Sequence, residues 1–281
     1  MIEAVFKYTF LQNAFLTAIF ASVVCGIVGT IIVEKKLVSF SGGIAHVSFG
    51  GIGLGYYMGF EPIFGGIAFA VLSALGVAQI RKRSNTNEDT LISMLWSAGM
   101  AMGILFIALT PGYPPDMTSY LFGDILTVNF LYLRVMMALS VIVLIVVFSL
   151  YNYWKIYLFD EEYASIMGIK TAALEFVLFL IISVSIVILI KVVGIILSIA
   201  MLTAPPAIVK LFTHRLSRVM IGAGILGVIF NLAGLSLSYQ LNIPSGATII
   251  LIAISSYLLA FSGKRLVTFW KRKQLNSTTQ E

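Results

Sequence analysis

The chain has 281 residues, of which 59% are hydrophobic and only 11% are charged. A soluble domain carries about a quarter charged residues, so this composition excludes a soluble protein and places most of the chain in lipid. The net charge of +6 does not indicate nucleic-acid binding, because the basic residues form short clusters between apolar runs, as topology signals do. The single cysteine, Cys25, excludes an intramolecular disulfide.

Nine apolar runs predict membrane-spanning helices, since a helix needs roughly 20 apolar residues to cross a bilayer. The expected fold is an all-α polytopic bundle that forms one transmembrane domain over residues 1–281. The second, seventh and ninth runs are short, which favours helices that are tilted, broken or buried among others. The predicted spans are 12–33, 44–59, 62–80, 90–109, 128–150, 174–191, 194–210, 219–239 and 246–262.

Lysine and arginine in the connections predict the orientation of these spans. With the N-terminus outside and nine crossings, fifteen of the eighteen basic residues fall on the inner side. Only Lys7, Arg134 and Lys191 remain outside or near the outer interface. The positive-inside rule therefore favours an odd number of spans and a cytoplasmic C-terminus.

Small residues dominate the stretch Val38–Gly59, VSFSGGIAHVSFGGIGLGYYMG. Gly51, Gly55 and Gly59 recur at every fourth position, so they share one face of a helix. Such a row lets a neighbouring backbone approach closely within a membrane. We therefore expect a tightly packed helix here.

A second row in the same stretch places Gly42, His46 and Gly50 on one face, with the imidazole between two residues that lack side chains. A histidine with free space on both sides is a candidate for contact with a transported solute. The alternative interpretation is a packing histidine that bonds to a neighbouring carbonyl.

The longest outer connection, TPGYPPDMTSYLFGDILTV, contains three prolines followed by Asp116 in a position typical of a helix N-cap. The predicted short helix runs to about Leu126, and it suits a re-entrant element at a pore mouth. Asp124 either faces the pathway or is a solvated loop carboxylate.

The inner connection KIYLFDEEYASIMGIKT, residues 155–171, predicts a short amphipathic helix over 160–168. Acidic residues occupy its first turn, an apolar face follows, and a glycine ends it. An uncovered apolar face on the cytoplasmic side predicts docking to a partner; the alternative is a helix on the inner leaflet, which three adjacent acids disfavour. These residues are Asp160, Glu161 and Glu162, then Tyr163, Ile166 and Met167, and finally Gly168.

The seventh span contains TAPPAIVKLF, in which Pro205 and Pro206 each lack a backbone N–H. This predicts a helix break near Thr203 and Ala204. A break inside lipid is tolerated only where the freed carbonyls meet protein or a water-filled path.

The sequence contains no GxxxxGK[ST] phosphate-binding loop, so any energy source is expected to come from another chain. Ser41 and His46 are five residues apart and lie on different faces of one helix, which argues against a Ser–His protease. We therefore predict no enzymatic activity.

Six segments in a fixed order resemble the membrane permease subunits of ATP-binding-cassette importers for zinc, manganese or iron(II). The resemblance covers nearly the whole chain. It implies a homodimer in the membrane of a prokaryotic cell, a separate ATPase subunit that receives the FDEE segment, and an extracytoplasmic metal-binding receptor. The segments are GIVGTIIVEKKLVSFSGGIAHVSFGGIGLG, NEDTLISMLWSAGMAMGILFI, YLFGDIL, FDEEYASIMGIKT, MLTAPPA and LNIPSGATIIL.

One departure from the family pattern concerns the metal. The family places an aspartate four residues before the histidine, but this chain has Gly42 there. Because one imidazole is a weak site for a divalent ion, further ligands are needed, with Glu34, Asp124, carbonyls near Pro205 or His46 of a second subunit as candidates. The metal is expected as transported substrate rather than as a bound cofactor. A chelated metal or another small solute, and an ion-coupled secondary transporter acting alone, are the alternatives.

Overall fold

The computed structural model describes residues 8–83, 88–112, 123 and 125–278. Within these residues every regular element is a helix, which confirms the predicted all-α fold. The elements are α2 (Thr9–Glu34), α3 (Val38–Met58), α4 (Pro62–Arg83), α5 (Glu88–Leu109), the 3-10 turn η1 (Ile125–Thr127), α7 (Phe130–Ser149), α8 (Tyr151–Phe159), α9 (Glu161–Ile166), α10 (Thr171–Val193), α11 (Ile195–Lys210), α12 (Leu216–Leu241) and α13 (Ser245–Thr278).

Seven helices of the described part are long and apolar enough to cross a membrane, namely α2, α4, α5, α7, α10, α12 and α13. Helix α3 has 21 residues but is rich in glycine and serine, and α11 has only 16 residues. Each of the nine predicted runs corresponds to one helix. That all nine cross the membrane, and the side on which each terminus lies, remain predictions.

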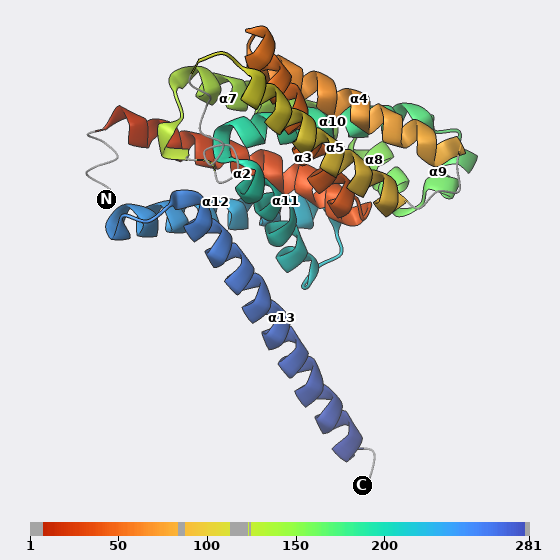
Figure 1. The fold of residues 1–281 in the computed structure, drawn as a ribbon. Coiled ribbons are helices and arrows are strands. Elements are labelled where there is room, and N and C mark those ends of the chain that lie inside the picture. The colour runs from red at the N-terminus through yellow and green to blue at the C-terminus, as the bar shows by residue number, and fades with distance from the viewer. Residues whose placement is uncertain (1–7, 84–87, 113–122, 124, 279–281) are drawn as a thin grey trace.

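Helix α2 runs through the middle of the bundle and packs against α7, α11 and α12 (Figure 1). It is the most buried of the seven apolar helices. Small residues permit this position: a Cβ built on Gly26 would lie only 2.5 Å from the backbone nitrogen of Gly224 in α12. Close backbone contact stabilises such an interface, because lipid provides no hydrophobic driving force between helices.

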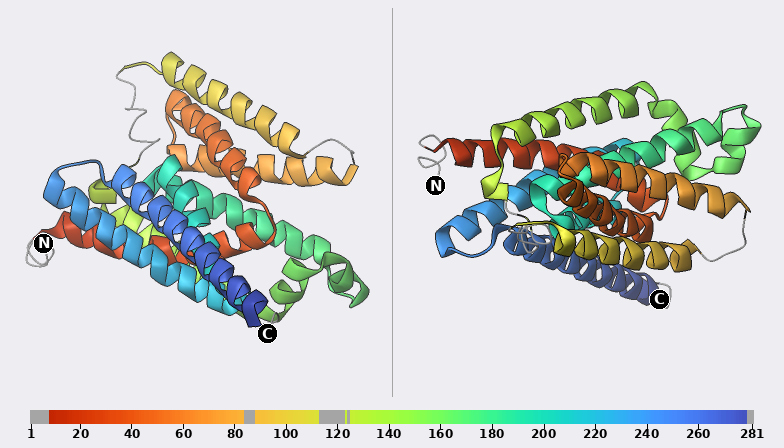
Figure 2. Two further views of the ribbon diagram at one scale, coloured as in Figure 1. Left: turned by 90° about the horizontal axis from the view of Figure 1, so that it is seen from below. Right: turned by 45° about the horizontal axis from the view of Figure 1, so that its top comes forward.

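Helix α3 packs between α4 and α5, and these three helices form a second group beside the bundle (Figure 2). Gly51 and Gly55 lie against α4, where a Cβ built on Gly51 would lie 2.1 Å from the carbonyl oxygen of Gly65. Gly59, the third glycine of that row, ends α3 in the left-handed region with φ of 75°. Helix α10 contacts both groups and joins them.

The predicted break in the seventh span is wrong, because α11 continues through Pro205 and Pro206. The two prolines deprive the carbonyl oxygens of Met201 and Leu202 of their intrahelical donors. The Leu202 oxygen lies against α2 instead, since a Cβ built on Gly29 would meet it at 2.2 Å. The freed oxygen of Leu202 thus faces the backbone of a neighbouring helix, as a broken hydrogen-bond ladder in a membrane requires.

Two further predictions concern the ends of elements. The short helix predicted from Asp116 to Leu126 lies mostly outside the described residues, and its described end forms η1. The ninth predicted span, 246–262, corresponds to α13, which continues to Thr278 and leaves the body of the molecule (Figure 1).

Candidate functional site

His46 lies in the middle of α3, and its imidazole stacks on the indole of Trp96 in α5. The ring centroids are 4.1 Å apart and the planes differ by 10°. Stacking uses the ring face, so the Trp96 indole does not block the ring nitrogens, which bind ligands in the ring plane. The Nδ1 atom is buried and has no hydrogen-bond partner among the described residues. Because a buried polar atom without a partner is costly, a bound ligand at this nitrogen would be stabilising.

The two glycines one turn away from His46 have different surroundings. A Cβ built on Gly42 would meet nothing within 4 Å, whereas one built on Gly50 would lie 2.9 Å from the carbonyl oxygen of Gly99 in α5. The free space expected on both sides of the imidazole therefore exists only on the Gly42 side. Helix α5 occupies the other side.

The other candidate ligands do not join His46 in a cluster. Glu34 is the last residue of α2, and its carboxylate forms an ion pair with Lys210 of α11 at 2.8 Å. Asp124 lies outside the described residues. The part of the chain that the structure describes holds no group of three or more His, Cys, Asp or Glu side chains that could bind a metal.

The segment predicted to dock to a partner forms α9, directly after α8. The Asp160 carboxylate caps α9 by accepting a hydrogen bond from the Tyr163 backbone N–H at 2.9 Å. Gly168, with φ of 77°, lies where the chain leaves the helix. Ile166 is 82% exposed and Met167 58% exposed, and Tyr163 is exposed beside them. The apolar face of α9 is thus uncovered in the described chain.

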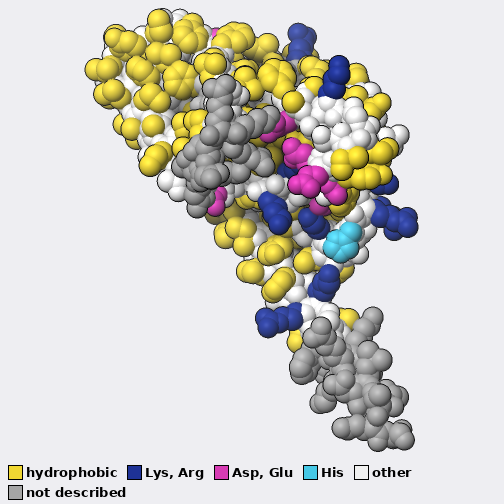
Figure 3. Space-filling model, turned by 90° about the vertical axis from the view of Figure 1, so that its right-hand side faces the viewer, with side chains coloured by type: hydrophobic (Ala, Val, Ile, Leu, Met, Phe, Trp, Pro, Cys, Tyr) yellow, Lys and Arg dark blue, Asp and Glu magenta, His cyan; other side chains and the backbone are white. Residues whose placement is uncertain are grey.

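An ion pair joins helix α9 to the end of α2. Lys35 Nζ lies 2.9 Å from the Glu161 carboxylate and 3.8 Å from the centroid of the Tyr157 ring in α8. Figure 3 views the molecule from the right-hand side of Figure 1. On this face, basic and acidic side chains lie close together. This end is the one that charge counting predicts to be cytoplasmic.

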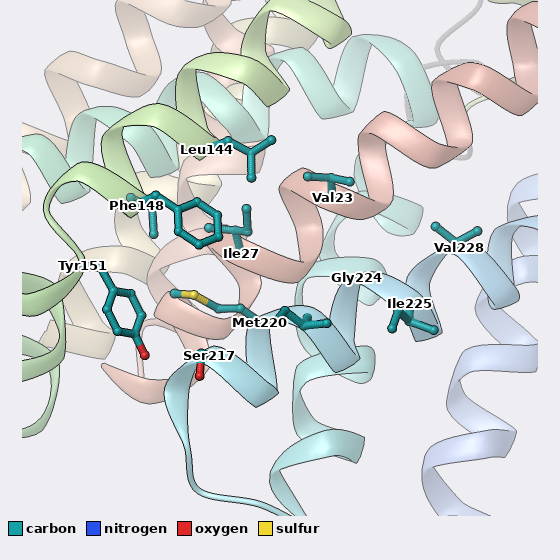
Figure 4. A pocket seen from close by; sticks show the side chains of 12 residues that line it. Val23, Ile27, Leu144, Phe148, Tyr151, Ser217, Met220, Gly224, Ile225 and Val228 are labelled. Carbon is teal, nitrogen blue, oxygen red and sulfur yellow. The ribbon is translucent and has the colours of Figure 1, made fainter.

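A pocket of about 280 Å³ lies between α2, α7 and α12 (Figure 4). Val23, Leu144 and Met220 are among its apolar lining residues, and only Tyr151 and Ser217 contribute hydroxyl groups. The lining contains no carboxylate or imidazole, so this pocket does not offer the ligands that a transition metal needs.

Residues 7–264 match the model of the ABC 3 transport family. The chain belongs to this family. An uncharacterized membrane protein of Synechocystis is 40% identical over 94% of this chain and 95% of its own length. A probable metal transport system membrane protein of Chlamydia pneumoniae is 34% identical (94% and 92%). The manganese transport system membrane protein MntC of Listeria monocytogenes is 29% identical (98% of each).

A solved structure of PsaBC from Streptococcus pneumoniae in complex with Fab contains a chain with the same fold. Its TM-score is 0.84 at 29% identity, and the match covers 92% of the present chain and 94% of that chain. The resemblance expected from the six sequence segments is confirmed, and the protein is a membrane permease of the ABC 3 transport family.

Sequence reasoning missed three contacts of this ABC 3 permease. The stacking of Trp96 on His46 and the ion pairs of Glu34 and Lys35 join residues far apart in the chain. A helical period reports which residues share a face of one helix, but it contains no information on which side chains meet across helices. Trp96 does lie within one of the six segments, which is the only signal that pointed to it.

Proposed function

We propose that this permease belongs to an importer for a divalent transition metal. The relatives named for metal transport support this substrate class, and the manganese transport protein of Listeria monocytogenes makes Mn²⁺ the first ion to test, with Zn²⁺ and Fe²⁺ next. The metal is the transported substrate, and the permease itself opens alternately to each side of the membrane. Import, rather than export, is the direction that the family resemblance implies.

The observation that carries this proposal is the buried, unpartnered Nδ1 of His46, together with open space at Gly42 one helical turn away. Imidazole nitrogen is a good ligand for transition metals and a poor one for Mg²⁺ or Ca²⁺. A single imidazole binds weakly, which suits a site that must also release its ion. The remaining ligands would come from Asp124 or from His46 of a second copy in a homodimer.

The energy for transport comes, in this proposal, from a separate ATPase subunit. The exposed apolar face of α9 supports docking there, because a short helix of this kind typically enters a groove of its partner. A metal-binding receptor on the outer side would deliver the ion to the permease.

The test is metal uptake by cells that produce the permease with its ATPase and receptor, measured by elemental analysis for Mn²⁺, Zn²⁺ and Fe²⁺. His46→Gln keeps bulk and hydrogen-bonding capacity but removes a good metal ligand, so uptake should fall by at least about tenfold, since even outer-shell partners contribute about 10–100-fold. Protein level should not change, and thermal stability should fall only slightly, because loss of the stack on Trp96 costs about 0.5–1.5 kcal/mol. Gly42→Asp adds a carboxylate one turn away and should strengthen metal binding.

His214→Gln is the matched control, because His214 is exposed in the connection between α11 and α12. It should transport as the unmodified protein does. Normal uptake by His46→Gln would mean that the ion crosses on other ligands. If the permease takes up a chelated metal but none of the three free ions, the substrate is the chelate.

A further inference from the structure

Two adjacent residues at the end of α2 form ion pairs with two different helices. Glu34 pairs with Lys210, the last residue of α11, at 2.8 Å, and Lys35 pairs with Glu161, the first residue of α9, at 2.9 Å. The side chains of Glu34 and Lys35 are only 8% and 17% exposed. Their partners Glu161 and Lys210 are 45% and 32% exposed, so the Glu34–Lys210 pair is the better shielded from water and the less screened of the two.

Each of these two ion pairs is accompanied by a second contact between α2 and the same neighbouring helices. The ammonium group of Lys35 also lies over the ring of Tyr157 in α8, next to α9. Helix α11 meets α2 again near the freed carbonyl oxygen of Leu202, which lies against Gly29. The end of α2 is therefore held to α8 and α9 on one side and to α11 on the other.

The same end of α2 leads into α3 through a tight turn of three residues. Lys36 adopts φ of 58°, and the Leu37 backbone N–H donates to the Ile32 carbonyl at 2.8 Å. Helix α3 begins at Val38, so His46 lies just over two turns beyond this connection. A turn fixed in this way makes the start of α3 follow any displacement of the end of α2.

We propose that Glu34 and Lys35 form a junction that transmits movement of α9 to α11 and to the His46 helix α3. The proposal rests on the function given above, in which α9 receives the ATPase. Glu34 and Lys35 act as positioning residues: neither needs to touch the transported ion. Because each ion pair joins the α2 end to a different helix, loss of either pair weakens the coupling of the α2 end, and of α3 behind it, to that helix.

The test uses the permease reconstituted with its ATPase, with metal transported per ATP hydrolysed as the main readout. Lys35→Glu places two negative charges together and should lower this ratio about tenfold, within the range measured for coupled charged pairs. The double variant Lys35→Glu with Glu161→Lys restores opposite charges and should recover most of the ratio. Glu34→Lys with Lys210→Glu provides the same test at α11.

Co-purification of the ATPase separates transmission from docking, and it should be unchanged in Lys35→Glu, which is not on α9. Lys36→Glu is the matched control: it makes the same charge change as Lys35→Glu on the adjacent exposed residue, outside the docking segment, and should leave the ratio unchanged. Where a charge reversal lowers the protein level, Lys35→Met and Lys210→Met keep the side-chain bulk and should also lower the ratio.

The outcomes distinguish the junction from the function on which it rests. If the unmodified complex moves no metal, the proposed substrate or partner is wrong. If it moves metal and the single variants retain a normal ratio, or the reversed pairs recover nothing, the junction is wrong and these ion pairs only stabilise the cytoplasmic end.

Discussion

At the scale of single residues, the glycines of α3 have different roles although they lie in similar rows. Gly51 lies where any side chain would collide with backbone of α4, whereas Gly42 faces open space. Packing explains the first glycine. Gly42 instead leaves space one turn from the His46 imidazole. Gly42 is also the position at which the family pattern has a carboxylate.

This difference gives a prediction for two otherwise identical substitutions. Gly51→Ala puts a methyl group 2.1 Å from the Gly65 carbonyl oxygen, so α3 and α4 must separate. Overpacking of this kind typically costs about 1–3 kcal/mol. Gly42→Ala has no such clash and should keep the melting temperature of the unmodified protein. Melting curves of both variants in the same detergent would measure the effect, and equal stability would show that α3 and α4 are less tightly packed than described.

At the scale of elements, α9 combines a capped, short helix with an apolar face that no described residue covers. Met167→Asp would place a charge in the proposed contact with the ATPase, where an uncompensated polar group costs at least about 1–3 kcal/mol. Co-purification of the ATPase should fall accordingly, while Met167→Leu, which keeps the apolar character, should retain it. Full retention with Met167→Asp, together with normal uptake, would mean that α9 is only a surface helix.

The sequence predicts helices well in this protein because apolar runs in a membrane protein have few alternatives to helix. It fails at Pro205 and Pro206, because a local rule for proline does not contain the contact between the Leu202 oxygen and Gly29 of another helix. The candidate site likewise combines features that local sequence patterns predict with features that only packing between helices produces. His46 and the exposed face of α9 are visible in local patterns, but the Trp96 stack and the pairing of Glu34 arise only from packing.

At the scale of the whole molecule, the topology depends on whether α3 and α11 cross the membrane. The 21 residues of α3 extend over about 31 Å, which matches a hydrocarbon core of about 30 Å. Because α4 and α5 enclose α3, it contacts little lipid and needs few apolar residues to cross. Helix α11, at about 24 Å, is shorter but lies among α2, α12 and α13. Enclosure by other helices therefore favours a crossing for both.

Cysteine labelling tests this topology, because the native Cys25 is buried and only 2% exposed, so it should not react. Lys36 and Phe60 flank α3 and are both exposed. With nine crossings, Phe60→Cys should react with an impermeant maleimide from outside, as should Gly112→Cys. Lys36→Cys and His214→Cys should react only after the membrane is opened. If Lys36→Cys and Phe60→Cys react from the same side, α3 does not cross, and the sides assigned to every later connection, α9 included, must be reassigned.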